Sequence, residues 1–183
     1  TLAELAGDMA AKADDIICEG VMGLFDGATQ SGDANDGSTA ALAEITGWPV
    51  ILVVDASKQA ASAAVLAKGF ADHRKNVDVA GVIFNKVGGP RHVERLEQAM
   101  ARIAPDLKIF GALPRNDDLQ LPSRHLGLIQ AREHRDLETF LDKAAAWVGE
   151  HLDIAAMRRV MRPWPVRPKS DAPVLIPPLG QRI

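Results

Sequence analysis

Residues 50–54 read Val-Ile-Leu-Val-Val, and the first polar side chain after them is Asp55. A strand with one face in water alternates polar and apolar residues, whereas a strand of a parallel sheet is covered by helices on both faces and reads as a continuous apolar run. This stretch therefore predicts a parallel strand that is buried on both faces. Because parallel strands are joined by crossover helices, it also favours an α/β fold.

The rest of the chain alternates strand and helix in the same way, which predicts a doubly wound, mostly parallel sheet. Apolar runs predict further strands at residues 16–18, 79–89 and 108–114. Periodic or capped segments predict helices at residues 2–13, from Gly37 or Ser38 to Gly47, at 57–72, after Pro90 and at 132–151. The residues expected to face the core from these helices are Leu2, Leu5, Met9, Ala13, Val93, Leu96, Met100, Ile103, Leu137, Phe140, Leu141, Ala144 and Val148.

Composition excludes several classes of partner. The net charge is −3 and aromatic residues make up 4% of the chain, so neither a basic patch nor a stacking surface for nucleic acid is indicated. No apolar run has membrane-spanning length. The single cysteine, Cys18, excludes an internal disulfide and favours a reducing cytoplasm; inside the predicted strand its thiol is expected to be buried and inert.

The last part of the chain differs from the rest. Six prolines occur in the 21 residues from Pro163 onward, a composition typical of an extended linker. We therefore expect a domain over residues 1–153 and a Pro-rich linker over residues 154–183. The chain also begins with Thr1 inside a helical pattern, which indicates a piece of a larger protein.

In open parallel sheets, ligands bind beyond the carboxyl ends of the strands. Four segments therefore deserve inspection: Glu19 to Asp26, Asp55 to Lys58, Asn85 to Val87 and Pro114 to Asp118. The histidines are scattered without metal-ligand spacing, so surface or local hydrogen-bond roles are expected for His73, His92, His134 and His151.

Each acidic or amide side chain in these segments has an ordinary interpretation beside the functional one. A carboxylate such as Glu19 at a strand end can hold Mg²⁺, and the nearby glycines and Asp26 favour this over a solvated acid. Asp26 alone would be a turn residue before Gly27. Asp55 fits a helix cap and a ligand contact equally well. Asn85 suits an adenine edge, although an Asn that ends a strand is most often part of a turn.

The phosphate-binding motif G-x-x-x-x-G-K-[ST] does not occur in the sequence. Four other stretches nevertheless resemble the cobyrinic acid or hydrogenobyrinic acid a,c-diamide synthases of cobalamin biosynthesis: EGVMGLFDG, GSTAALAEITGWPVILVVDAS, GVIFNKV and GALPRNDDLQLPSRHLGL. The similarity extends from Asp14 to about Asp153. Members of that family have an N-terminal P-loop ATPase domain of the dethiobiotin-synthetase type and then a class I glutaminase domain. The resemblance implies that this chain is the ATPase domain without its Walker A segment, which would precede Thr1.

The resemblance also implies a reaction and the residues that carry it. ATP phosphorylates the a and c acetate groups of a corrinoid, and ammonia from glutamine displaces the phosphate. Glu19 would coordinate Mg²⁺, and Asp26 would orient the intermediate or accept a proton from ammonia. Adenine would be held by Asn85, Pro114 and Arg115, with Ser38 and Asp55 beside the substrate.

Several expectations remain open beside this one. The macrocycle could instead be a nickel sirohydrochlorin, and the fold could serve as a non-catalytic binding module. The presence of all three residues Glu19, Asp26 and Asn85 argues against a non-catalytic module, which would have no reason to keep them together. The chain alone is expected to be inactive, and a homodimer is an option that the sequence leaves open.

Overall fold

The computed structural model describes residues 7, 9, 12–28, 36–119, 123–124, 127–128 and 137–163. The chain divides into two compact units. One comprises residues 1–48 with 162–183, and the other comprises residues 49–161. Among the described residues, no helix is both long enough and apolar enough to cross a membrane.

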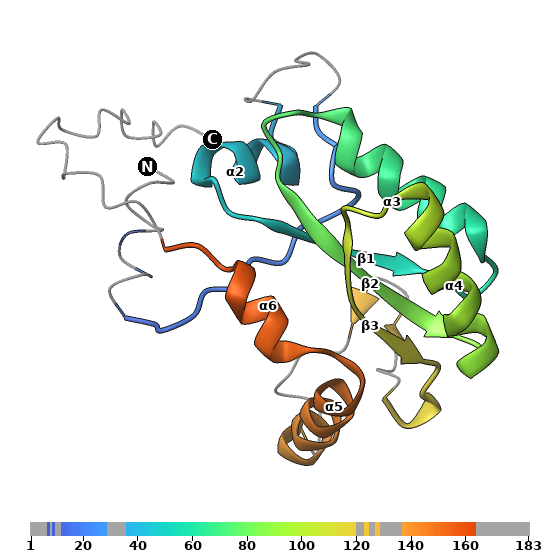
Figure 1. The fold of residues 1–183 in the computed structure, drawn as a ribbon. Helices are drawn as coiled ribbons and strands as arrows, with labels where there is room; N and C mark the ends of the chain where they lie inside the picture. The colour runs from blue at the N-terminus through green and yellow to red at the C-terminus, as the bar shows by residue number, and fades with distance from the viewer. Residues whose placement is uncertain are drawn as a thin grey trace, which may run out of the picture. The chain divides into compact units, whose positions relative to one another are not determined.

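The larger unit is built on three parallel strands, β1 (Val50–Asp55), β2 (Val79–Val87) and β3 (Lys108–Pro114), in the order β1-β2-β3 (Figure 1). The strands predicted from the three apolar runs are therefore confirmed, and β3 has the predicted bounds. In the part of the chain that the structure describes, β1 pairs with β2 alone, so its other edge has no strand beside it.

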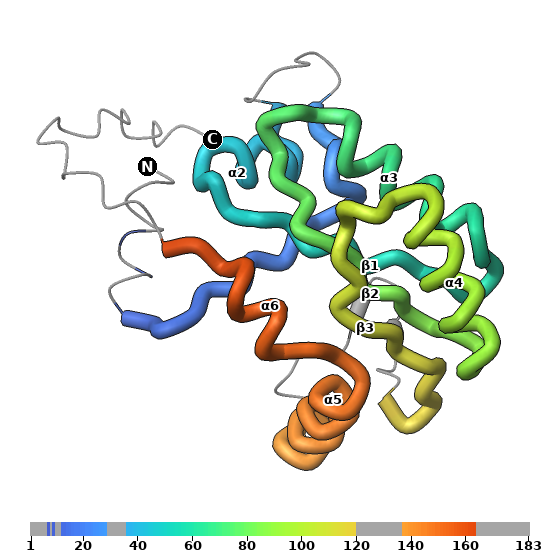
Figure 2. Tube along the Cα trace, in the orientation of Figure 1, coloured from blue at the N-terminus to red at the C-terminus, as the bar shows by residue number. Residues whose placement is uncertain are grey.

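Helices connect the strands and cover both faces of the sheet. Helix α3 (Ala61–His73) joins β1 to β2, and α4 (Pro90–Ile103) joins β2 to β3, as the path of the chain in Figure 2 shows. Neighbouring residues of a strand point to opposite faces. On one face Ile83 of β2 packs with α6 (Ile154–Val160), so Val82 and Phe84 face the helices on the other side. This is the predicted doubly wound arrangement.

Large apolar side chains fill both layers of this unit. Phe84, Phe110, Leu96, Met100 and Val82 are its largest fully buried side chains. Leu96 and Met100 lie on the face of α4 that the sequence predicted, together with Ala99. Burial of this kind contributes roughly 2 to 3 kcal/mol for each large side chain.

The outer edge of β3 is covered by the joint between α5 (Leu137–His151) and α6. Leu152 forms an antiparallel bridge with Gly111, and the N–H of Asp153 donates to the carbonyl of Phe110 at 2.8 Å. Gly111 has a φ of 151°, and a Cβ there would run into the carbonyl oxygen of His151. Only glycine therefore allows the joint to approach the strand this closely.

In the smaller unit, α2 (Thr39–Thr46) begins and ends where the sequence predicted. The hydroxyl of Ser38 accepts a hydrogen bond from the N–H of Ala41 at 3.1 Å. Gly47 closes the helix with a φ of 67°, the left-handed conformation that glycine adopts most readily. The preceding segment is attached to this helix, because the N–H of Ala40 donates to the carbonyl of Leu24 at 2.9 Å.

The strand predicted at residues 16–18 is wrong. These residues are not in a strand, Ile17 is 85% exposed and the Cys18 thiol is exposed rather than buried. A short apolar run becomes a strand only where a neighbouring strand supplies hydrogen bonds, and no described strand pairs with this one. The expected helix at residues 2–13 lies mostly outside the described residues.

Three further predictions need correction. Val53 is 64% exposed, so β1 is parallel as predicted but is not covered on both faces. Leu141 on α5 is 49% exposed, although Leu137, Phe140, Ala144 and Val148 are half-buried as expected. Helix α3 begins at Ala61 rather than residue 57, because Asp55 and Ala56 organise a turn before it.

Candidate functional site at the carboxyl ends of the strands

Parallel register brings three of the predicted site residues to one edge of the sheet. Asp55 at the end of β1 lies opposite Asn85 of β2, and Val87 of β2 lies opposite Pro114 at the end of β3. Arg115 follows Pro114 directly and is exposed. The expectation that these positions share the ligand-binding edge of the sheet rests on this register.

Asp55 is engaged by its neighbours. Its Oδ2 lies 2.6 Å from the ammonium nitrogen of Lys86, and its Oδ1 accepts from the N–H of Ser57 at 2.9 Å. The Lys86 ammonium, followed by Ser57, holds the pKa of the Asp55 carboxyl well below its usual range. Because α3 begins only at Ala61, Asp55 caps the turn at Ser57 and not the helix.

Lys86 has an unusual backbone conformation beside Asn85. Its φ is 58°, which lies in the left-handed region that residues other than glycine, Asn and Asp rarely adopt. The Oδ1 of Asn85 accepts from the N–H of Lys86 at 2.9 Å, which stabilises this conformation. The side-chain oxygen of Asn85 therefore makes the contact expected of a turn residue. Its amide nitrogen is the group that could donate a hydrogen bond to a ligand.

Lys86 is the site residue that the sequence reasoning missed. Its pairing with Asp55 spans 31 positions and depends on the register of two neighbouring strands. A signal was available, because a lysine near the carboxyl end of a strand can reach an acid at the end of the adjacent parallel strand.

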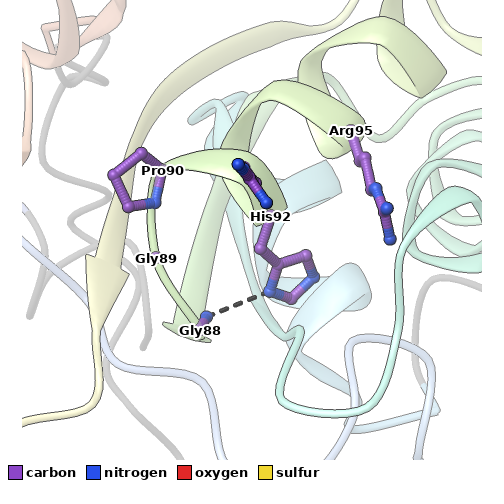
Figure 3. Close-up of a pocket in the computed structure, with 6 residues that line it drawn as sticks. Gly88, Gly89, Pro90, His92 and Arg95 are labelled. Atoms are coloured by element: carbon purple, nitrogen blue, oxygen red, sulfur yellow. Dashed lines mark hydrogen bonds between the residues drawn. The ribbon is translucent and has the colours of Figure 1, made fainter.

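Beside this edge, the first turn of α4 lines an open pocket with the loop that precedes it (Figure 3). The lining residues are Gly88, Gly89, Pro90, Arg91, His92 and Arg95. His92 points back toward the loop, where its Nδ1 accepts from the N–H of Gly88 at 3.0 Å. The local hydrogen-bond role predicted for His92 is confirmed, as it is for His151, whose Nδ1 contacts the carbonyl of Trp147 at 2.8 Å.

Glu19, Asp26 and Ser38 belong to the smaller unit. Glu19 is exposed in a segment without regular structure. The Oδ2 of Asp26 accepts from the N–H of Gly23 at 2.9 Å, and the N–H of Asp26 donates to the carbonyl of Gly23 at 3.1 Å. A Cβ on Gly23 would lie 2.5 Å from that carboxylate oxygen, so a larger residue there would displace the Asp26 side chain. Ser38, in addition to capping α2, donates its N–H to Asp36 Oδ1 at 2.8 Å.

The acidic residues allow a limited kind of metal site. No three His, Cys, Asp or Glu side chains gather as a metal-binding group within the ranges that the structure describes. Mg²⁺ in phosphate-transfer sites is commonly held by one or two carboxylates, with waters and phosphate oxygens as the other ligands. The exposed carboxylate of Glu19 fits this sparse type of site.

A family model described as an AAA domain matches residues 1–123. The chain belongs to this family. The parallel sheet and its flanking helices are accordingly the P-loop NTPase-like fold that the sequence predicted. No solved structure gives a significant match to this chain.

The chain is also similar to several curated proteins that are each named hydrogenobyrinate a,c-diamide synthase. It is 45% identical to the one from Rhodobacter capsulatus over 177 residues, which cover 97% of this chain and 40% of the relative. The chain is 45% identical to the Brucella ovis protein, and the alignment covers 92% of this chain and 37% of that relative. It is 44% identical to the Rhizobium meliloti protein, and the alignment covers 97% of this chain and 40% of that relative. The family resemblance noted in the sequence is confirmed, and the chain spans about two fifths of the length of these relatives.

Proposed function

We propose that this chain is the ATP-using part of an amidoligase that converts the a and c acetate carboxylates of hydrogenobyrinic or cobyrinic acid into amides. The observation that carries the proposal is the 45% identity across 97% of the chain to a hydrogenobyrinate a,c-diamide synthase. The AAA family supports the use of ATP. The alignment of Asp55, Asn85 and Pro114 at one edge of the sheet supports a binding site there.

The chemistry explains why such residues are needed. A carboxylate is a poor acyl donor until one oxygen is made a leaving group, and phosphorylation achieves this by bringing two anions together. Preorganised charges and dipoles must offset their repulsion. When bound, Mg²⁺ would supply positive charge at the phosphates, with Glu19 as its protein ligand. Asp26 would lie near the reacting groups, where its carboxylate orients the intermediate or takes a proton from ammonia.

The proposed nucleotide contacts lie on the larger unit. The amide nitrogen of Asn85 would donate a hydrogen bond to adenine, while its oxygen continues to accept from the N–H of Lys86. Pro114 and Arg115, at the end of β3, would border the same ring. Asp55 and Ser38 are the proposed substrate neighbours, and the ion pair of Asp55 with Lys86 means that a substrate there would meet a paired carboxylate.

The remaining parts of the activity are proposed for a longer parent protein. Its phosphate-binding loop and strand would precede Thr1, and the edge of β1 that no described strand covers offers a place for another parallel strand. A glutaminase domain beyond the Pro-rich stretch that begins at Pro163 would supply ammonia. The chain alone would then be inactive, and its cytoplasmic location and any homodimer belong to the same proposal.

The test is Glu19→Gln in the full-length parent, with Glu138→Gln as the matched control on the exposed side of α5. Loss of one preorganised electrostatic group costs ~2 to 4 kcal/mol, so turnover with ATP, Mg²⁺ and ammonia should fall roughly 30- to 1000-fold. The control should remain near wild type. Unchanged Mg²⁺-dependent turnover in Glu19→Gln would remove the metal assignment.

The substrate is tested separately by offering the parent metal-free, cobalt-containing and nickel-containing macrocycles. Mass spectrometry should detect the gain of two amides on hydrogenobyrinic or cobyrinic acid. Amidation of nickel sirohydrochlorin in preference to both would replace the proposed substrate, and absence of ATP hydrolysis with every macrocycle would favour a binding module.

A further inference from the structure

His92 makes hydrogen bonds to two loops that are distant in the sequence. It lies in the first turn of α4, and its Nδ1 accepts from the N–H of Gly88 at 3.0 Å in the loop after β2. Its Nε2 contacts the carbonyl of Gln59, 33 positions earlier, at 2.5 Å in the loop after β1. Figure 3 shows the ring turned toward Gly88, with this hydrogen bond as a dashed line.

The two partners fix where the ring carries its proton. The N–H of Gly88 can only donate, so Nδ1 must be the unprotonated nitrogen. The carbonyl of Gln59 can only accept, so Nε2 must carry the hydrogen. This arrangement requires the neutral imidazole, because a protonated ring would turn a second N–H toward the donor of Gly88.

Both loops lead directly to the residues at the carboxyl ends of the strands. The side-chain amide of Gln59 donates to the carbonyl of Asp55 at 3.2 Å. Gly88 follows Lys86 by two positions, and Lys86 pairs with Asp55. The charged groups around this network are Arg91 and Arg95, which line the same pocket as His92, and the Asp55–Lys86 pair.

We propose that His92, with its hydrogen on Nε2, is a positioning residue that fixes the loop after β1 to the loop after β2 and so holds these two loops in place beside Asp55 and Lys86 at the ligand-binding edge. The ring does not need to touch the ligand for this role. The inference rests on the proposed nucleotide site for its functional consequence, whereas the tautomer and the bridge between the loops stand on the geometry alone.

The first experiment tests the bridge without nucleotide. The parent protein, labelled with ¹⁵N-histidine, is studied by NMR at pH 8, and the His92 signals are identified by their loss in His92→Asn. The nitrogen shifts should be those of a ring with hydrogen on Nε2 and none on Nδ1. A ring with hydrogen on Nδ1, or a rapid mixture of both tautomers, would overturn the proposal whatever the variants do.

The second experiment separates the two contacts. His92→Asn keeps an acceptor near the position of Nδ1 for the N–H of Gly88 and removes the contact to Gln59, whereas His92→Phe removes both. His73→Asn, an exposed histidine at the end of α3, is the control. The KM for ATP should rise roughly 3- to 10-fold in His92→Asn, the change expected for one hydrogen bond, with kcat nearly unchanged.

The outcomes distinguish this inference from the proposed function. If His92→Asn has the wild-type KM while His92→Phe does not, the contact to Gln59 positions nothing and the inference fails. If the tautomer is as stated but the parent shows no ATP-dependent turnover at all, the proposed function fails and the bridge between the loops remains.

Discussion

The ammonium nitrogen of Lys86 lies 2.6 Å from Oδ2 of Asp55 and joins the ends of two neighbouring parallel strands. The side chains of Lys86 and Asp55 are 48% and 51% exposed, so water screens the pair and its contribution to stability is small. Its importance is geometric, because it fixes one carboxylate at the edge of the sheet where ligands of parallel α/β folds bind.

We expect the stabilisation by this pair to disappear in acid. The folded-state pKa of Asp55 is lowered by Lys86, so the stabilisation is fully present above the unfolded-state pKa of an aspartate, ~3.9, and is lost as the pH falls below it. Asp55→Asn should lower Tm by at most ~4 °C at pH 7. The difference from wild type should shrink below about pH 4. A difference that stays constant from pH 7 to pH 3 would show that Lys86 does not set this pKa.

Gly111→Ala should loosen the joint between α5 and α6 from β3. The new Cβ would meet the carbonyl of His151 at a φ that disfavours side chains, so the free energy of unfolding should fall by ~2 to 5 kcal/mol. The matched control is Gly69→Ala in α3, where a Cβ meets nothing within 4 Å. There the helix should gain ~0.5 to 1 kcal/mol. Urea unfolding of the three proteins measures both effects, and equal stability of the two variants would contradict the close approach at Gly111.

Ser38 can be tested as a cap and as a substrate neighbour in one series. Ser38→Ala removes the acceptor for the N–H of Ala41 and should lower the free energy of unfolding by ~1 kcal/mol, whereas Ser38→Gly should lower it by only a few tenths. If the hydroxyl also contacts substrate, both variants should lose turnover equally in the parent. Turnover that follows stability instead would assign Ser38 to the helix alone.

Asn85→Asp should separate the turn from the proposed contact to adenine. The substitution keeps an oxygen that accepts from the N–H of Lys86 and removes the amide donor. We expect the KM for ATP in the parent to rise by ~10-fold, with little change in Tm. Asn76→Asp, in the exposed loop before β2, is the control for the added charge. A KM equal to that of the control would exclude a contact through the amide nitrogen.

Elements governed by local chemistry could be predicted from the sequence. Ser38 and Gly47 mark the two ends of α2 because a hydroxyl cap and a left-handed glycine act within one turn of the helix. The strands were predictable because their apolar runs are long enough to exclude an exposed loop. The three residues from Ile16 to Cys18 were not, since a run this short becomes a strand only when a partner lies beside it.

The candidate site was predictable only in outline. The common edge of Asp55, Asn85 and Pro114 follows from parallel strand order alone. The long-range contacts around this edge do not, because Lys86 reaches Asp55 across 31 positions of sequence and His92 reaches the carbonyl of Gln59 across 33. The proposed metal and catalytic roles of Glu19 and Asp26 stay predictions.

The unpaired edge of β1 has a consequence for handling this polypeptide. Among the described strands, none pairs with the backbone donors and acceptors of this edge, and Val53 in the same strand is an apolar side chain that is 64% exposed. Such an edge is a template for sheet-to-sheet aggregation between molecules, and a lysine in place of Val53 is the type of gatekeeper that natural proteins use to prevent it.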